Sequence, residues 1–385
     1  MHGVALLVPA IIFGKKGRGL NTMGLYLHVP FCDGKCPYCD FYSAPPSEGE
    51  MDRYADALVR ELYRWHERLG RKARTLFLGG GTPTLLGARR LEFLLRAAKE
   101  TFLTEDAEIT CEANPRSAME GLLDSLARAG VNRLSFGLQS ANEEELALLG
   151  RRHSSADARR AVEAARRAGI QNISLDLMLC LPGQTAEHLL RSIDFCLSLG
   201  VPHVSAYMLK VEPGTPFAAR GMERFLPDED AQRELYLLAC ERLERAGLMQ
   251  YEISNFARPG MECRHNLLYW NDQEYLGLGP AAHSFLDGRR FYYPPSTDEF
   301  CAGTSPEDDG EGGDFTEYAM LRLRLREGLT EQESLARFGR AIPNRLRERA
   351  RRLEAAGLVE SGKQFLRLTR EGFLVSNAVL ANLLL

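Results

Sequence analysis

Hydrophobic and polar positions alternate along the first two-thirds of the chain in a way that predicts strands separated by helices. Amphipathic patterns predict helices over 51–69, 88–102, 118–129, 155–168 and 186–199. Short apolar runs rich in β-forming residues predict strands over 24–31, 74–81, 107–115, 133–140, 172–182 and 203–210. Parallel strands need a long return connection, which a helix supplies, so this order predicts a parallel sheet. The fold class is α/β, either an open doubly wound sheet or a complete or partial β/α barrel.

The pattern changes after about residue 225. A helix is predicted over 228–247, and an irregular, aromatic-rich region follows it. The segment "AGTSPEDDGEGGD" over 302–314 is polar and rich in glycine, which predicts a linker or mobile loop. Residues 315–385 read as helices with a small hairpin over 357–369, an order that resembles a winged helix. Arginine and glutamate alternate on its main helix, which favours a solvated face over DNA contact.

Composition excludes several classes of protein. The net charge of −4 gives no broad attraction for nucleic acid, and nine cysteines, mostly scattered, suit a reducing compartment such as the cytoplasm. The N-terminal stretch "VALLVPAIIFG" is too short to span a membrane, and no basic residue precedes it as in a signal peptide. Residues 1–22 are either a start-site artefact, because Met23 directly precedes the first strand, or a flexible or weakly membrane-associating tail.

The stretch "HVPFCDGKCPYCDF" over 28–41 contains three cysteines in a C-x3-C-x2-C array, Cys32, Cys36 and Cys39. Three thiolates this close can surround one soft metal centre, either zinc or an iron–sulfur cluster. A structural zinc needs four ligands, and His28 is expected to lie within the first strand. A [4Fe-4S] cluster on three cysteines leaves one iron open for a small molecule, so the pattern favours a cluster.

Other unusual residues follow the ends of the predicted strands, where ligands gather in parallel folds. "GGGTPT" over 79–84 is either a ligand-binding turn or only a tight strand-to-helix turn. Glu112 and Asn114 end the third strand, and Gln139 ends the fourth. Asp176 lies inside the apolar run "SLDLMLCLP", so it needs either an arginine partner or ligand hydroxyls. Together these positions predict a polar pocket.

The cysteine array resembles that of the radical S-adenosylmethionine (SAM) superfamily, in which it holds a [4Fe-4S] cluster whose open iron binds SAM. The segments "YLHVPFCDGKCPYCDF", "GGGTPT", "EANP", "NRLSFGLQS", "GRRHS", "LDLMLCLPGQT" and "EPGTPF" narrow this resemblance. They are similar to the group that contains oxygen-independent coproporphyrinogen III oxidase and the HemW-type heme chaperones, over nearly the whole chain from Tyr26. The resemblance implies SAM contacts at Tyr26, Tyr38, Gly80, Gly81, Thr82, Glu112, Gln139, Arg151 and Asp176.

The same resemblance implies a partial (β/α)6 radical SAM barrel with a mainly helical, winged-helix-like C-terminal domain. The expected parts are an N-terminal extension (1–22), the barrel (23–225), a region that completes the barrel and binds heme (226–301), a linker (302–314) and the C-terminal domain (315–385).

Two departures separate the chaperone from the oxidase within this group. The oxidase motif has a fourth cysteine where this chain has Phe41. "CRHNLLYW" over 263–270 matches the H-N-x-x-Y-W motif associated with heme binding in the chaperones. The match implies His265 as first choice of axial ligand and Cys263 as second, with Tyr269 and Trp270 as flat apolar surface. Taken without the family, these would be a structural histidine and core aromatics.

The resemblance therefore implies a heme chaperone with a SAM-ligated [4Fe-4S] cluster, which delivers heme to acceptors such as respiratory enzymes. An electron donor would be a further partner, and membrane-bound acceptors would bring this cytoplasmic protein to the membrane surface. The first alternative is a radical oxidative decarboxylase of coproporphyrinogen III in porphyrin biosynthesis. A radical SAM enzyme acting on another substrate is the second, and a nucleic-acid-binding role is the least favoured.

Overall fold

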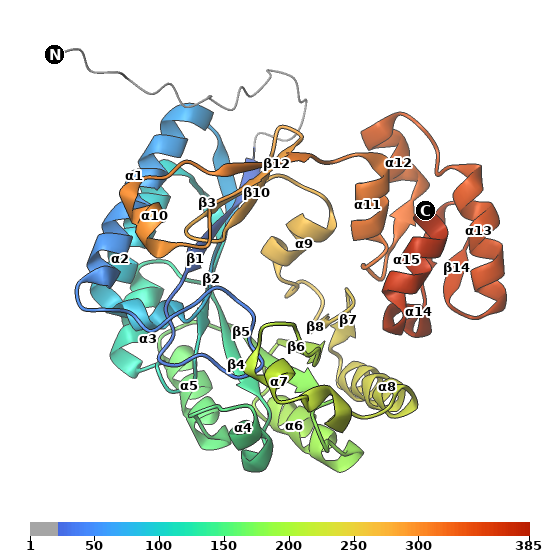
Figure 1. The fold of residues 1–385 in the computed structure, drawn as a ribbon, viewed down its shortest axis with the longest axis horizontal. Helices are drawn as coiled ribbons and strands as arrows, with labels where there is room; N and C mark the ends of the chain where they lie inside the picture. The colour runs from blue at the N-terminus through green and yellow to red at the C-terminus, as the bar shows by residue number, and fades with distance from the viewer. Residues whose placement is uncertain (1–21) are drawn as a thin grey trace.

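The protein is built around one large curved sheet with a smaller domain beside it (Figure 1). A computed structural model describes residues 22–385. The extension expected over 1–22 lies outside the described residues, except for Thr22, which begins the first strand. The sheet has 12 strands in the order β12-β11-β10-β9-β1-β2-β3-β4-β5-β6-β8-β7.

Six parallel strands form the middle of the sheet and confirm the predicted strands. They are β1 (Thr22–Val29), β2 (Lys72–Gly80), β3 (Leu103–Ala113), β4 (Arg133–Gln139), β5 (Asn172–Leu179) and β6 (His203–Met208). Each pairs in parallel with the next along the chain. A doubly wound sheet reverses its strand order at a switch point. The sequential order and the curvature in Figure 1 instead make a partial (β/α)6 barrel.

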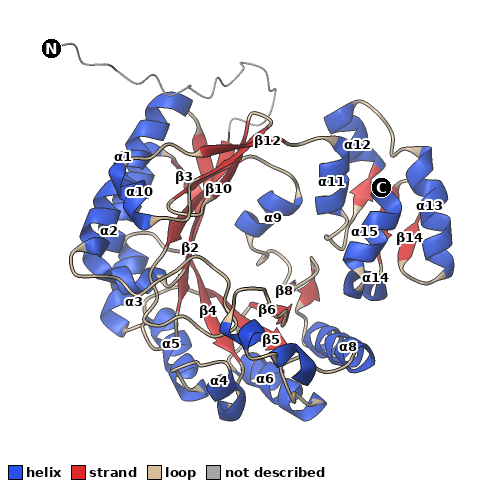
Figure 2. Cartoon of the chain, viewed as in Figure 1, coloured by secondary structure: helices blue, strands red, loops and turns tan. Residues whose placement is uncertain are grey.

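Helices cover the outer, convex face of this barrel (Figure 2). The longer helices have an apolar stripe at helical spacing. In the helix that follows β1, for example, Tyr54, Leu58, Leu62 and Trp65 are buried. The helices are α1 (Glu50–Leu69), α2 (Gly87–Thr101), α3 (Glu120–Arg128), α4 (Glu143–Leu148), α5 (Ser155–Arg167), α6 (Ala186–Ser198) and α8 (Glu229–Arg245). The outward-facing side chains of β1, such as Leu25, Leu27 and Val29, are fully buried beneath them.

Shorter strands extend both edges of the parallel core. β9 (Tyr275–Leu278) runs parallel to β1, and β10 (His283–Leu286), β11 (Arg289–Tyr292) and β12 (Glu307–Glu311) add antiparallel strands beyond it. At the other edge, β8 (Asn255–Ala257) and β7 (Met249–Gln250) follow β6. The prediction of a linker over 302–314 is wrong for residues 307–311, because β11 offers a backbone edge on which this polar segment pairs as β12.

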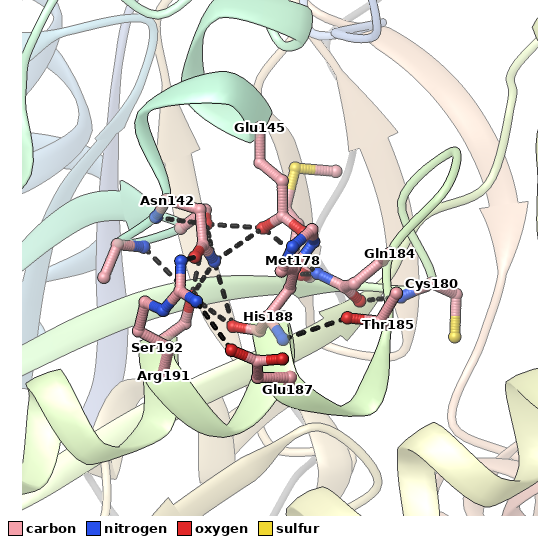
Figure 3. A network of polar contacts seen from close by, with 12 residues as sticks. Asn142, Glu145, Met178, Cys180, Gln184, Thr185, Glu187, His188, Arg191 and Ser192 are labelled. Atoms are coloured by element: carbon pink, nitrogen blue, oxygen red, sulfur yellow. Dashed lines mark hydrogen bonds and ion pairs between the residues drawn. The ribbon is translucent and has the colours of Figure 1, made fainter.

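The loop after β5 is fixed by a buried polar network between α4 and α6 (Figure 3). Cys180 adopts a left-handed φ of 60°, and its N–H donates to Gln184 Oε1 at 2.7 Å. Asn142 Nδ2 donates to the carbonyl of His188 at 2.9 Å and to Glu145 Oε2 at 3.2 Å. The "PGQT" turn that ends the predicted motif "LDLMLCLPGQT" is therefore held by side-chain hydrogen bonds at the carboxyl end of the strand.

The C-terminal domain consists of helices around a three-stranded antiparallel sheet in the order β13-β15-β14. The predicted hairpin is confirmed as β14 (Val359–Ser361) and β15 (Phe365–Leu368), with β13 (Leu329–Thr330) beside it. The helices are α11 (Phe315–Arg322), α12 (Glu331–Phe338), α13 (Asn344–Ala355), α14 (Arg370–Leu374) and α15 (Ser376–Leu384). An ion pair of Arg337 with the buried Asp272 joins this domain to the barrel region. No helix within residues 22–385 is long and apolar enough to cross a membrane.

Candidate functional site

The inner, concave face of the barrel is lined with polar side chains. Side chains of one strand alternate between faces, so residues two apart in sequence share a face. Glu112 of β3 is in register with Ser135 of β4, which pairs with Ser174 of β5, and Ser174 pairs in turn with His203 of β6. Ser174 Oγ lies 2.8 Å from His203 Nδ1. This polar row crosses the inside of the barrel, opposite the face that the helices bury.

The three cysteines lie on the loop that follows β1. Cys32, Cys36 and Cys39 are unpaired thiols, each partly exposed. The loop is closed at its base by two backbone bonds, Cys32 N–H to the carbonyl of Ala44 at 3.1 Å and Ala44 N–H to the carbonyl of Pro30 at 2.9 Å. The backbone therefore presents all three thiols from one short segment at the carboxyl end of the strand.

A cavity of about 280 Å³ opens beside two of these thiols, Cys32 and Cys36. Arg151 Nη1 donates to the Cys36 sulfur at 3.5 Å, and Thr82 Oγ1 lies 3.8 Å from the Cys32 sulfur. A nearby guanidinium stabilises thiolates, which are the form that binds iron. Burial raises the pKa of the Cys39 thiol, so metal binding there would have to release its proton.

The chemistry of the three thiols fits an iron–sulfur cluster. Within residues 22–385, no three histidine, cysteine or acidic side chains converge closely enough to hold one ion. In a [4Fe-4S] cluster each cysteine binds a different iron atom, so three thiols on one loop can hold three of its four irons. The residues present therefore fit a [4Fe-4S] cluster, with Cys32, Cys36 and Cys39 as its protein ligands.

The glycines after β2 make room for the cysteine loop. A Cβ on Gly81 would lie 2.4 Å from the carbonyl oxygen of Phe31, and one on Gly80 would lie 2.6 Å from the ring of His28. Backbone N–H groups of Gly81 and Thr82 donate to the carbonyls of Val29 and Phe31, each at 2.7 Å. The "GGG" turn thus fixes the start of the cysteine loop by direct backbone pairing.

Two acidic residues lie deeper in the barrel. Asp176 Oδ1 accepts from Ser135 Oγ at 3.0 Å and from Ser174 Oγ at 3.4 Å, and Glu112 Oε2 accepts from the N–H of Gly80 at 3.2 Å. Burial, followed by the charge of Asp176, raises the pKa of Glu112 to about 8, and burial also raises the pKa of Asp176. Serine hydroxyls are therefore the direct partners of Asp176, and Arg133 acts on it only through its charge.

Gln139, Arg151, Tyr38 and Tyr26 surround the same region. Gln139 ends β4 with a left-handed φ of 67°, and Arg151 Nη2 donates to the carbonyl of Gly137 at 2.8 Å. Arg151 Nε is buried without a hydrogen-bond partner. The Tyr38 ring packs edge-on against Phe217 with centroids 6.2 Å apart. The structure thus brings the cysteine loop, the glycine turn, Gln139 and Arg151 together at the barrel mouth, with Tyr26, Glu112 and Asp176 further inside.

The H-N-x-x-Y-W motif forms α9 (Arg264–Trp270), which lies on the concave side of the sheet (Figure 1). Glu108 of β3 accepts from the N–H groups of Arg264 and His265, each at 3.1 Å. His265 is 1% exposed; its Nδ1 lies 2.7 Å from Thr75 Oγ1 and its Nε2 lies 2.8 Å from the Tyr269 hydroxyl. Burial lowers the pKa of His265 to about 3.

The four motif residues are therefore not all placed around one cavity. Cys263 is fully buried, with its sulfur 3.7 Å from Glu108 Oε1. Tyr269 reaches a pocket beside the sheet, whereas the Trp270 ring lies under the Arg324 guanidinium, 5.9 Å from its centroid. In the described conformation both nitrogens of His265 are engaged, so ligation of iron by His265 requires α9 to open.

Sequence reasoning missed Thr75, Glu108 and Arg133, which are buried on the inner face, and His283, which lines the pocket near Tyr269. A signal for Glu108 is present, because Glu108, Thr110 and Glu112 alternate with apolar residues along β3. His283 begins β10, a strand of four residues that is too short for a comparable alternation to mark it.

An incomplete parallel barrel with three unpaired thiols after its first strand and a glycine turn after its second defines a radical SAM protein. The radical SAM superfamily matches residues 26–196, and the HemN C-terminal domain matches residues 315–375. The structure is similar to coproporphyrinogen III oxidase (HemN) from Escherichia coli, with a TM-score of 0.81 and 23% identity over 94% of this chain and 90% of that chain. At this identity the likeness concerns the fold.

Sequence similarity identifies the family within the radical SAM superfamily. The heme chaperone HemW of Mycobacterium tuberculosis H37Rv is 40% identical over 94% of this chain and 95% of its own length. The heme chaperone HemW of Escherichia coli K12 is 37% identical over 94% of this chain and 98% of its own length. The chain belongs to the HemW heme chaperone family of the radical SAM superfamily.

Proposed function

We propose that the protein binds heme and passes it to heme-requiring acceptor proteins, with a [4Fe-4S] cluster and SAM bound in its barrel. The observation that carries this proposal is the 40% identity, over nearly the whole length of both chains, with a heme chaperone. Phe41 further supports a chaperone function. The oxidase motif has a fourth cysteine at this position, two residues after Cys39, and this chain lacks it.

The barrel residues have separate tasks in this proposal. A cluster held by Cys32, Cys36 and Cys39 supplies one-electron chemistry and an iron without a protein ligand. Arg151 donates a hydrogen bond to the sulfur of Cys36, and the glycine turn keeps backbone close to the ligand. The buried carboxyl groups of Glu112 and Asp176 accept hydrogen bonds from hydroxyl groups of the ligand. These bonds replace the hydrogen bonds to water that the carboxyl groups lose on burial. The assigned SAM contacts are Tyr26, Tyr38, Gly80, Gly81, Thr82, Glu112, Gln139, Arg151 and Asp176.

We further propose that the acceptors include respiratory enzymes, that an electron donor serves the cluster, and that the protein acts in the cytoplasm. All nine cysteines are unpaired within residues 22–385, which suits a reducing compartment. The formal net charge of −4 gives no reason to assign a nucleic-acid partner. Acceptors in a membrane would be met at its surface.

Two measurements on one anaerobic preparation test the proposal. Reconstituted protein should hold about four irons per chain, and Cys36→Ser should lower this number, because one iron loses its ligand. Titration with hemin should give a saturable Soret shift near one heme per chain. Absence of specific heme binding would contradict the chaperone function, and turnover of coproporphyrinogen III with SAM and a reductant would assign the protein to the oxidase reaction instead.

A further inference from the structure

A pocket of about 570 Å³ lies between the inner sheet, α9 and the C-terminal domain. Its volume falls within the roughly 300–1,000 Å³ that cofactor and ligand pockets occupy. Aromatic side chains dominate its wall, and the rings of Tyr269 and Tyr275 meet edge to face with centroids 4.5 Å apart. The aromatic residues that line it are Tyr26, Phe41, Tyr42, Tyr269, Tyr275 and Phe285.

Two parts of the chain that differ between chaperone and oxidase meet at this pocket. Phe41, which replaces the fourth cysteine, is 62% exposed and lines the wall together with Asp40. Tyr269 of the H-N-x-x-Y-W motif lines it from α9. Beside the other aromatic side chains of the wall, the exposed Phe41 ring adds apolar surface on which the flat face of a porphyrin can pack.

Three histidines lie in or beside this pocket, and their ring nitrogens differ in availability. His28 Nε2 donates to the carbonyl of Tyr42 at 3.0 Å, so its Nδ1 accepts from the Tyr26 hydroxyl at 2.9 Å. His265 is engaged at both nitrogens, as described above. His283 has no hydrogen bond to its Nε2 from any residue within 22–385, and its side chain is 60% exposed.

The His283 ring is placed by two neighbouring side chains. Its ring stacks on Tyr292 with centroids 5.2 Å apart and planes 25° apart, and its Nδ1 lies 4.0 Å from Asp309 Oδ2 of β12. Asp309 thus stands beside Nδ1 at more than hydrogen-bond distance, and the stacking on Tyr292 limits rotation of the ring. Nε2 stays free to bind a metal ion. An imidazole that binds heme iron in this way is a common axial ligand.

We propose that this pocket is the heme site and that His283 Nε2 is the axial ligand of the heme iron. The assignment rests on the proposed heme-binding function and gives it a place and a ligand. Heme in this pocket contacts the loop residues directly after Cys39, so the cluster loop and the heme share a wall. His265 then has a positioning role, because it holds Tyr269 against the pocket through its Nε2.

Hemin titration of four proteins tests the assignment: wild type, His283→Ala, His265→Ala and the control His66→Ala on α1, remote from the pocket. We expect His283→Ala to raise the Kd at least tenfold and to remove the imidazole signature from the electron paramagnetic resonance and Soret spectra. His66→Ala should match the wild type. His265→Ala should keep the imidazole signature even if its affinity falls.

A second variant separates lost ligation from lost folding. His283→Gly should bind heme poorly alone and recover the imidazole spectrum when free imidazole is added, because imidazole can enter the space of the missing ring. Wild-type affinity and spectrum in His283→Ala would overturn this assignment while leaving heme binding intact. Loss of the imidazole signature in His265→Ala alone would assign the ligand to His265. Absence of heme binding in the wild type would overturn the proposed function and this site together.

Discussion

Glu108 accepts two hydrogen bonds from the first turn of α9, and its replacement has a large predicted effect. The Glu108 side chain is buried and accepts two hydrogen bonds from the first backbone N–H groups of the helix. A hydrogen bond to a charged group contributes roughly 1.5–3 kcal/mol, and an orphaned buried donor costs a comparable amount. Partial rehydration of the space left by Glu108→Ala reduces the total, so we expect α9 to lose about 3–4 kcal/mol of local stability.

Native-state hydrogen exchange measures this loss directly, because it reports the free energy of local opening. Every 1.4 kcal/mol is about a factor of ten in an equilibrium constant, so exchange over residues 263–270 should accelerate by roughly two to three orders of magnitude. Peptides from α2 on the outer face should be unchanged. Glu108→Gln keeps one acceptor oxygen without the charge and should give an intermediate acceleration.

The matched control is Glu105→Ala, since Glu105 is an exposed carboxylate on the same strand. Surface substitutions of this kind usually change stability by less than about 0.5 kcal/mol. Stabilisation of α9 by Glu108 is refuted if exchange over 263–270 changes less than about threefold in Glu108→Ala, or if Glu105→Ala has an equal effect. Either result would mean that α9 is held by its apolar contacts and not by its N-terminal hydrogen bonds.

Two further predictions concern the barrel mouth. Gly81→Ala places a Cβ 2.4 Å from the carbonyl oxygen of Phe31, so the cysteine loop must shift, and iron per chain should fall by about half or more while circular dichroism is unchanged. Gly121→Ala meets no atom within 4 Å and should keep full iron; equal iron in both variants would contradict this. The pKa of Glu112 is raised from 4.5 to about 8, so its contribution to stability is present below pH 4.5 and lost as pH rises through 8. The melting temperature of cluster-free protein should therefore fall less between pH 5.5 and pH 8.5 in Glu112→Gln than in wild type or in Glu105→Gln. Equal falls in all three proteins would contradict a buried neutral acid at position 112.

The parallel core was predictable because each strand and each crossover helix carries its own signal. Leu25, Leu27 and Val29 alternate with polar positions in β1, and α1 repeats apolar residues at helical spacing. β12 could not be predicted in this way, since its residues are acidic and glycine-containing and have no strand preference of their own. It forms because β11 provides a hydrogen-bonding edge, which is a property of the assembled sheet.

The candidate site shows the same difference between local signals and contacts that only the fold creates. The cysteine array is local, so the spacing of Cys32, Cys36 and Cys39 predicts a shared metal centre without reference to the fold. The environment of His265 is not local: Thr75 is 190 positions away and Glu108 is 157 positions away, and only the fold brings them to α9. The sequence motif therefore indicated a functional region, while the contacts that decide which nitrogen is free became visible only in three dimensions.

The position of Phe41 in the fold gives a structural reason for the missing fourth cysteine. Asp40 and Phe41 line the aromatic pocket, whereas Cys32 and Cys36 line the cavity on the other part of the same loop. A thiol at position 41 would place a reactive, iron-binding group in the wall of the proposed heme pocket, where it would compete with an imidazole for the iron. Phenylalanine offers apolar contact without a competing ligand. The single change from cysteine to Phe41 is thus consistent with a loop that holds a cluster on one side and an exchangeable heme on the other.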